Sequence, residues 1–387
     1  MKLWTVVVNG ATADVDAYID DLLDALADVQ VDSAKRMTRS WATLIEVDVR
    51  LCEAECRCLR WVETSGGDTA YSGWLRDLGS GALYSAFRQD ALPLDPSKCA
   101  VLGEFSYASV RPDRVILMTD HYATHPIYYW RGKSGQWVAS NDLRLLLLCR
   151  LVPLEIRRDS CMEHLTQSVM VGENELAGGA TFFSGVLKMP VNSVLSIDRT
   201  GRAFELTPAR EEAAFRLDGT ISRREDFEQE FRARLDACVL DRIEAGASGI
   251  LLSGGVDSNT VLGASLSTRR RPAPFCATMG FRDGDLAMSQ DDKLVEALVR
   301  HCGVPHRFIY ADDFLRLPML DDACAYVDGP DAAANPLAKE ACARVLQDHH
   351  VSLVMTGEGG DAILGESMHP WILDSIREHD GIEALHK

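Results

Sequence analysis

Residues 249–258 read GILLSGGVDS, and this stretch decides the fold of the second half of the chain. Its apolar start is typical of a buried strand, its small residues indicate a tight turn, and Val261 and Leu266 continue it as a helix. Glycines let backbone N–H groups approach an anion, Ser253 and Ser258 add hydroxyl donors, and a helix N-terminus adds positive potential. The pattern therefore predicts a phosphate site.

The kind of phosphate site is narrowed by what the stretch lacks. It has neither the Gly-Lys-Ser/Thr of the ATPase P-loop nor the three-glycine dinucleotide fingerprint, which disfavours a motor and a dehydrogenase. The carboxylate of Asp257 suits the Mg²⁺ ion that accompanies a nucleotide. The alternative is a tight strand-to-helix turn in which Asp or Ser only caps the helix.

A second glycine-rich turn, TGEGGD at residues 356–361, follows another predicted strand. Ligands of open α/β sheets bind where the strands end, so both turns should open at the same edge of one sheet. The first turn also resembles the pyrophosphate-binding loop of enzymes that split ATP between its α and β phosphates. That resemblance implies that Asp361 faces Asp257 across magnesium pyrophosphate, and that Glu358 lies near a reacting carboxyl group as the candidate catalytic residue.

Beyond residue 227 the predicted strands and helices alternate, which indicates a parallel sheet covered on both faces. The helix at 227–245 is followed by strand 249–252, a helix after Asp257, strand 274–279, helix 291–301, strand 306–310, helix 338–347 and strand 352–356. We expect an ATP-binding domain over residues 227–387, preceded by a polar linker at 207–226.

Residues 1–206 instead favour a strand-rich α+β domain. Short β-runs lie at 2–8, 114–119, 127–130, 137–140 and 193–197, and helices are predicted at 15–26 and 82–88. Antiparallel sheets with helices packed on them fit this pattern best.

Composition excludes several classes of protein. A formal net charge of −18 disfavours a nucleic-acid partner, and no apolar run is long enough to cross a membrane. The 11 cysteines are an odd number on a long chain without a signal peptide, which favours reduced thiols and the cytoplasm. Cys52, Cys56 and Cys58 lack the fourth ligand of a zinc site.

The two turns, in this order and at this spacing, resemble those of the asparagine synthetase family, and residues 291–306 resemble its segment between the second and third strands. The resemblance implies a PP-loop ATP pyrophosphatase fold that uses ATP and Mg²⁺, with the adenosine contacted by the backbones of Leu251, Met279 and Gly357. The predicted nucleotide-binding residues are thus Leu251, Ser253, Gly254, Gly255, Asp257, Ser258, Met279 and Gly357, and the predicted metal ligands are Asp257 and Asp361.

Upstream, residues 103–108, 126–129 and 139–143 resemble the glutaminase domain of that family, which implies an αββα sandwich of the N-terminal nucleophile hydrolases. There an N-terminal cysteine attacks glutamine. This chain has Lys2 at that position and no cysteine before Cys52, so we expect no glutamine hydrolysis. Lasso-peptide macrolactam synthetases and β-lactam synthetases are relatives that resemble this chain in lacking that cysteine.

The predicted activity is therefore ATP-dependent amide formation through an acyl-adenylate. Among such reactions, the sequence favours the macrolactam or isopeptide closure of a peptide. Alternatives are a β-lactam synthetase, an ammonia-using synthetase, and a non-catalytic subunit that binds nucleotide or peptide. Expected partners are a peptide or small amino-carboxylate substrate and a leader-peptide-binding or protease protein. Family members continue into helices carrying a catalytic lysine, whereas this sequence reaches Lys387 soon after Asp361. That leaves an incomplete chain, completion by a partner, or reduced activity.

Overall fold

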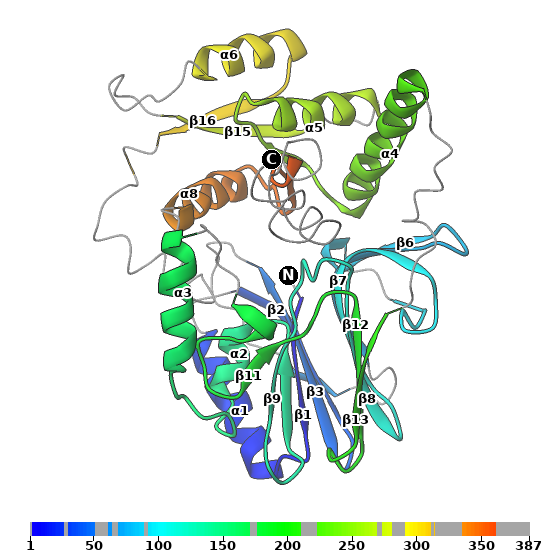
Figure 1. Cartoon of the computed structure of the whole chain (residues 1–387), viewed down its shortest axis with the longest axis vertical. Helices are drawn as coiled ribbons and strands as arrows, with labels where there is room; N and C mark the ends of the chain where they lie inside the picture. The colour runs from blue at the N-terminus through cyan, green and yellow to red at the C-terminus, as the bar shows by residue number, and fades with distance from the viewer. Residues whose placement is uncertain are drawn as a thin grey trace, which may run out of the picture. The chain divides into compact units, whose positions relative to one another are not determined.

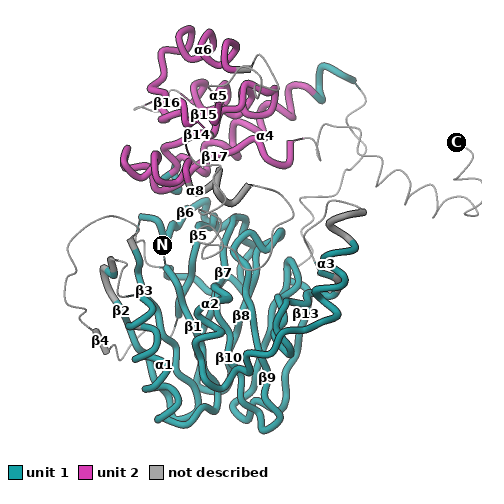
Figure 2. The backbone as a smooth tube through the Cα atoms, turned by 90° about the vertical axis from the view of Figure 1, so that its left-hand side faces the viewer, with its two compact units in different colours: residues 1–227, 244–246, 316–340 teal, residues 228–243, 247–315, 341–387 magenta. Residues whose placement is uncertain are grey.

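The structure, a computed structural model, describes residues 2–26, 30–50, 61–63, 69–88, 92–170, 176–209, 223–268, 273–280, 291–310, 313 and 335–360. The chain has a mixed α/β fold in two compact units (Figure 2). Unit 1 comprises residues 1–227, 244–246 and 316–340, and unit 2 comprises residues 228–243, 247–315 and 341–387. Most of the predicted linker, together with Cys52, Cys56, Cys58 and Asp361, lies outside the described residues.

Unit 1 contains two largely antiparallel sheets, visible in Figure 1. The first has the order β11-β9-β10-β1-β3-β2-β4 and the second has the order β13-β12-β8-β7-β5-β6. Their strands are β1 (Lys2–Val8), β2 (Gln30–Thr38), β3 (Ala42–Arg50), β4 (Trp61–Glu63), β5 (Thr69–Asp77), β6 (Leu83–Ser85), β7 (Val101–Val110), β8 (Arg114–Thr119), β9 (Tyr128–Arg131), β10 (Trp137–Ser140), β11 (Val186–Lys188), β12 (Ser193–Asp198) and β13 (Phe204–Pro208). The helices are α1 (Thr12–Ala25), α2 (Leu143–Leu148) and α3 (Arg158–Met170), with short 3₁₀ turns η1 (Ala86–Arg88) and η2 (Ala177–Gly179).

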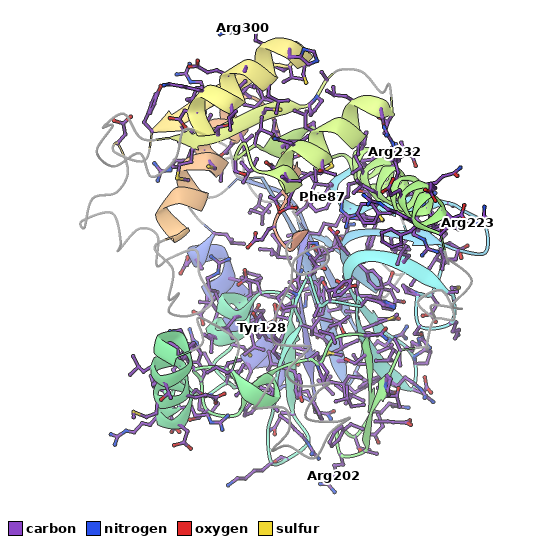
Figure 3. All side chains as sticks on the ribbon, turned by 45° about the horizontal axis from the view of Figure 1, so that its top comes forward. Phe87, Tyr128, Arg202, Arg223, Arg232 and Arg300 are labelled. Atoms are coloured by element: carbon purple, nitrogen blue, oxygen red, sulfur yellow. The ribbon has the colours of Figure 1, made fainter. Side chains whose placement is uncertain are left out.

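Successive side chains of β1 point to opposite faces of the first sheet, and this alternation explains how the layers of unit 1 pack. Its residues Trp4, Val6 and Val8 enter the apolar core shared by the two sheets, where they meet residues such as Ala108 and Leu117. The opposite face of the first sheet packs against α1 and α2, and Tyr128, labelled in Figure 3, belongs to that cluster. Side chains at 92–99 cover the outer face of the second sheet. Within the described part of unit 1, three of the four expected αββα layers are therefore present, and no α-helix covers this last face.

The helix predicted at 82–88 is wrong. Leu83–Ser85 is a strand that pairs with β5, with Trp74 opposite Ser85, and only Ala86–Arg88 forms a 3₁₀ turn. The backbone groups of this stretch find partners on a neighbouring strand, and such tertiary pairing overrides a weak local helical pattern. The structure also contains long strands that the sequence pattern missed, namely β2, β3, β5 and β7.

Unit 2 is a four-stranded parallel sheet of order β16-β15-β14-β17, with helices on both faces. Its elements are α4 (Arg224–Ala245), β14 (Gly249–Leu251), α5 (Val256–Ser267), β15 (Phe275–Gly280), α6 (Asp291–Cys302), β16 (His306–Tyr310), α8 (Asn335–Asp348) and β17 (Val354–Met355), although the ends of α4 and the start of α8 are counted in unit 1. Ile250 and Cys276 face α4, α5 and α6, whereas Ala277 and Ile309 face α8. The predicted parallel sheet with two covered faces is confirmed. Among the described residues, no helix has the length and apolarity needed to span a membrane.

Because the Cys276 thiol is buried, we expect the free energy of unfolding to fall at alkaline pH. The side chain is fully buried, and this desolvation raises the pKa from its ordinary 9.0 to about 12. Because the folded-state pKa is the higher one, the full stability is present below pH 9 and is lost as the pH rises towards about 12. The free energy of unfolding should fall by up to about 1.4 kcal/mol per pH unit in that window.

Urea unfolding between about pH 8 and about pH 11 measures this loss. Other groups also titrate in alkali, so a Cys276→Ala protein serves as the control and should show a shallower pH dependence. Equal slopes for the two proteins would contradict the prediction.

Candidate nucleotide site

The two glycine-rich turns leave neighbouring strands of the unit 2 sheet. β14 pairs in parallel with β17, with Gly249 opposite Val354 and Ile250 opposite Met355. The two strands lie next to each other (Figure 2) and end at the same edge, so the turns that follow them start side by side. The two turns can be recognised in the sequence, but only the strand order places them next to each other.

The first turn presents the N-terminus of α5 without a side-chain cap. Gly254 has a φ of +83°, a conformation that glycine adopts without strain. Gly255 is the N-cap residue and makes no side-chain hydrogen bond to the helix. The first N–H groups of α5 thus receive no acceptor from the capping residue, and this end of the helix can accept an anion.

The two serines of this turn have different surroundings. Ser258 is buried; its Oγ accepts from the Ser253 N–H at 3.2 Å and lies 3.2 Å from the Gly255 carbonyl oxygen, to which it can donate. Ser253 is exposed, and its Oγ accepts from the Gly255 N–H at 3.3 Å. Ser258 therefore shapes the turn from inside, whereas Ser253 stands at its surface.

The second turn packs directly on the start of α5. A Cβ added to Gly357 would lie 2.6 Å from the Ser258 nitrogen and 3.0 Å from the Asp257 carbonyl carbon. A Cβ added to Gly360 would lie 2.4 Å from Cγ of Asp257. Gly357 must be glycine, because the main-chain atoms that its Cβ would meet cannot move aside, whereas a Cβ at Gly360 would force the Asp257 side chain to shift.

The acidic residues of the site are Asp257 and Glu358. Asp257 lies in the first turn of α5, partly exposed and beside Gly360, so its carboxylate oxygens could bind a hard cation such as Mg²⁺. Glu358 is exposed at the tip of the second turn, where its N–H donates to Thr356 Oγ1 at 3.3 Å. The pairing of Asp257 with Asp361 stays a prediction, since the described residues include only one partner. No group of three metal-binding side chains occurs among the described residues.

Leu251 and Met279, the residues predicted to contact adenosine, lie on the α8 face of the sheet. Both are partly buried and pack against the cluster that contains Ala277, Ile309 and Leu346. They lie on adjacent strands, since Leu251 pairs with Ala277, two residues before Met279. They form an apolar border beside the ends of β14 and β15.

Three further polar residues adjoin the first turn, and the sequence pattern did not single them out. The buried Thr278 donates its hydroxyl to the Leu252 carbonyl oxygen at 2.6 Å, and His306 Nε2 lies 2.8 Å from the same hydroxyl. Asn259 Nδ2 donates to the Gly254 carbonyl oxygen at 3.1 Å. A threonine inside the otherwise apolar strand predicted at 274–279 is the one local signal by which this arrangement could have been found.

Comparisons with known proteins address the C-terminal part of the chain. Residues 230–379 match the family model described as asparagine synthase. No curated protein matches the chain.

Similar solved structures include the NH3-dependent NAD synthetase from Campylobacter jejuni, at 16% identity and a TM-score of 0.25, covering 36% of this chain and 60% of that one. The chain thus spans 60% of the NAD synthetase. They also include the glutamine phosphoribosylpyrophosphate amidotransferase from B. subtilis, at 8% identity and a TM-score of 0.27, covering 94% of this chain and 92% of that one. TM-scores this low carry no argument about fold or function. The one likeness that bears on function is therefore the family match: residues 230–379, which hold both glycine-rich turns, match the asparagine synthase model.

Proposed function

We propose that the chain forms an amide bond by activating a substrate carboxylate with ATP as an acyl-adenylate. One observation carries the proposal: the uncapped N-terminus of α5 and the turn at 356–360 lie against each other at the ends of two parallel strands. A phosphate chain fits such a site, because the N–H groups of the helix point outward and the helix dipole favours negative charge. The asparagine synthase match supports the same chemistry.

In the proposed reaction a substrate carboxylate oxygen attacks the α-phosphorus of ATP, and the bond to the β-phosphate oxygen breaks. Pyrophosphate leaves while the first turn, with Ser253 and the start of α5, binds its charge. Asp257, with Asp361, would hold Mg²⁺, which neutralises the phosphate charge when it is bound. An amine then attacks the acyl carbon, AMP departs with the bonding electrons, and the amine loses a proton. Positioning and electrostatic stabilisation supply the rate in such a reaction.

The amine in this proposal belongs to the substrate itself. None of the residues of β1, Lys2–Val8, is a cysteine, so the unit that resembles a glutaminase has no thiol on this strand. Lys2 instead lies with its Nζ 5.4 Å from the centre of the Tyr71 ring. We therefore propose macrolactam or isopeptide closure of a peptide, with a leader-peptide-binding or protease protein as partner.

The test is to incubate the protein with Mg–ATP and candidate peptides or amino carboxylates, and to measure nucleotide and product together. We expect AMP and pyrophosphate, and a product lighter than the substrate by one water. Product in which NH2 replaces OH would point to free ammonia as the amine. Formation of ADP and phosphate would overturn the proposal of an acyl-adenylate intermediate. Release of glutamate from glutamine would overturn the proposal that the amine belongs to the substrate.

A further inference from the structure

The inference concerns the peptide that joins Leu252 to Ser253, at the point where β14 turns into the first glycine-rich turn. Strand pairing between β14 and β15 ends at Leu251 and Ala277, and the Leu252 N–H still donates to the Ala277 carbonyl oxygen at 2.8 Å. The Leu252 carbonyl oxygen instead accepts a hydrogen bond from the Thr278 side chain at 2.6 Å. The Thr278 side chain thus supplies a hydrogen-bond donor at the point where the backbone pairing of β14 with β15 ends.

The same peptide unit is held from its other side as well. The Ser253 N–H donates to Ser258 Oγ at 3.2 Å, and Ser258 is buried in the first turn of α5. Two buried hydroxyl groups therefore fix the plane of this peptide, one on its carbonyl and one on its N–H. A fixed peptide plane at this position sets the direction of the chain through Gly254 and Gly255.

The hydrogen-bond chain continues outward to β16. A threonine hydroxyl has one proton, and in Thr278 that proton goes to the Leu252 carbonyl oxygen. The hydroxyl oxygen must then accept from His306 Nε2, which lies at 2.8 Å. Burial lowers the pKa of His306, an effect that Glu296 partly offsets, so the imidazole is neutral at neutral pH and its one proton belongs on Nε2. Such a chain polarises each of its members.

We propose that Thr278 and His306 are positioning residues that hold the Leu252–Ser253 peptide and so orient the turn that binds the pyrophosphate part of ATP. This rests on the proposed function, because the turn must bind ATP for its orientation to matter. The location agrees with such a role: Thr278 shares its sheet face with the apolar Cys276, where a hydroxyl adds nothing to packing.

The test compares the binding of two ligands by titration calorimetry, the non-hydrolysable analogue Mg–α,β-methylene ATP and AMP. Thr278→Val removes the donor and His306→Ala removes the imidazole, whereas Thr278→Ser and His306→Gln each keep a donor. We expect Thr278→Val and His306→Ala to weaken binding of the ATP analogue about tenfold, with AMP binding unchanged. Thr278→Ser and His306→Gln should restore most of the loss.

Thr260→Val is the matched control, since the Thr260 hydroxyl donates to the Val256 carbonyl oxygen within α5 at 2.7 Å. It should bind both ligands like the wild type. If Thr278→Val fails to fold, the His306→Ala and His306→Gln pair decides the question. An equal loss for ATP analogue and AMP, or no loss for either, overturns the positioning role. Failure of the wild type to bind the ATP analogue overturns the proposed function, and the positioning role with it.

Discussion

A Gly357→Ala protein is expected to bind Mg–ATP about a hundredfold more weakly than the wild type, because about 3 kcal/mol of overpacking strain falls on the site itself. The added Cβ would lie 2.6 Å from the Ser258 nitrogen, one of the N–H groups at the start of α5. Main-chain atoms on both sides cannot move independently, so the second turn must shift away from the helix. The phosphate groups would then meet a site with one wall displaced.

Gly263→Ala is the matched control, because nothing lies within 4 Å of a Cβ added there and the residue belongs to the same helix α5. It should keep wild-type binding and gain roughly 0.5–1 kcal/mol of helix stability. Titration calorimetry with α,β-methylene ATP gives the affinities, and thermal unfolding checks that each variant folds. Wild-type affinity in Gly357→Ala would contradict the contact between the two turns as the basis of the site.

An Asp257→Asn protein is expected to form pyrophosphate roughly 10²–10³-fold more slowly, because in the proposed function the change removes a charge that would hold Mg²⁺ against the reacting phosphates. The asparagine side chain has nearly the same shape, so the packing beside Gly360 should persist. Pyrophosphate release at increasing Mg²⁺ is the measurement, and the variant should need more Mg²⁺ for half-maximal rate.

Removing Asp257 also removes a negative charge that interacts favourably with the helix dipole, and Asp226→Asn controls for this effect. Asp226 is likewise an acidic residue in the first turn of a helix, α4. It shares the interaction with the helix dipole but not the position beside the second turn. It should leave the rate and the Mg²⁺ requirement unchanged. If Asp257→Asn kept the wild-type Mg²⁺ requirement, Asp257 would not be a metal ligand.

Local patterns in the sequence were sufficient for the elements around the first turn. GILLSGGVDS predicted a strand, a glycine turn and a helix, and the structure has β14, Gly254 with positive φ, and α5 there. Strong apolar runs also located β1, β8 and β10 at their observed bounds. These stretches are dominated by short-range periodicity and turn chemistry, which a single sequence displays.

Features that depend on pairing between distant strands could not be predicted in this way. Within the segment at 82–88, Leu83–Ser85 pairs with β5 in a sheet, against the helical pattern of the sequence. The roles of Thr278 and His306 depend on where the pairing of β14 with β15 ends, which no local pattern records. The contact of Gly357 with Ser258 likewise exists only because β17 lies beside β14.

The pairing of Gly249 with Val354 also sets an order of events during synthesis of the protein. The first turn leaves the ribosome long before the strand that carries the second one, so the newly made chain waits with one edge of β14 unpaired. That edge is only three residues long, Gly249–Leu251, which limits its capacity to recruit strands from other chains. β17 is the last strand among the described residues, so under the proposed function the nucleotide site is complete only after this strand pairs with β14.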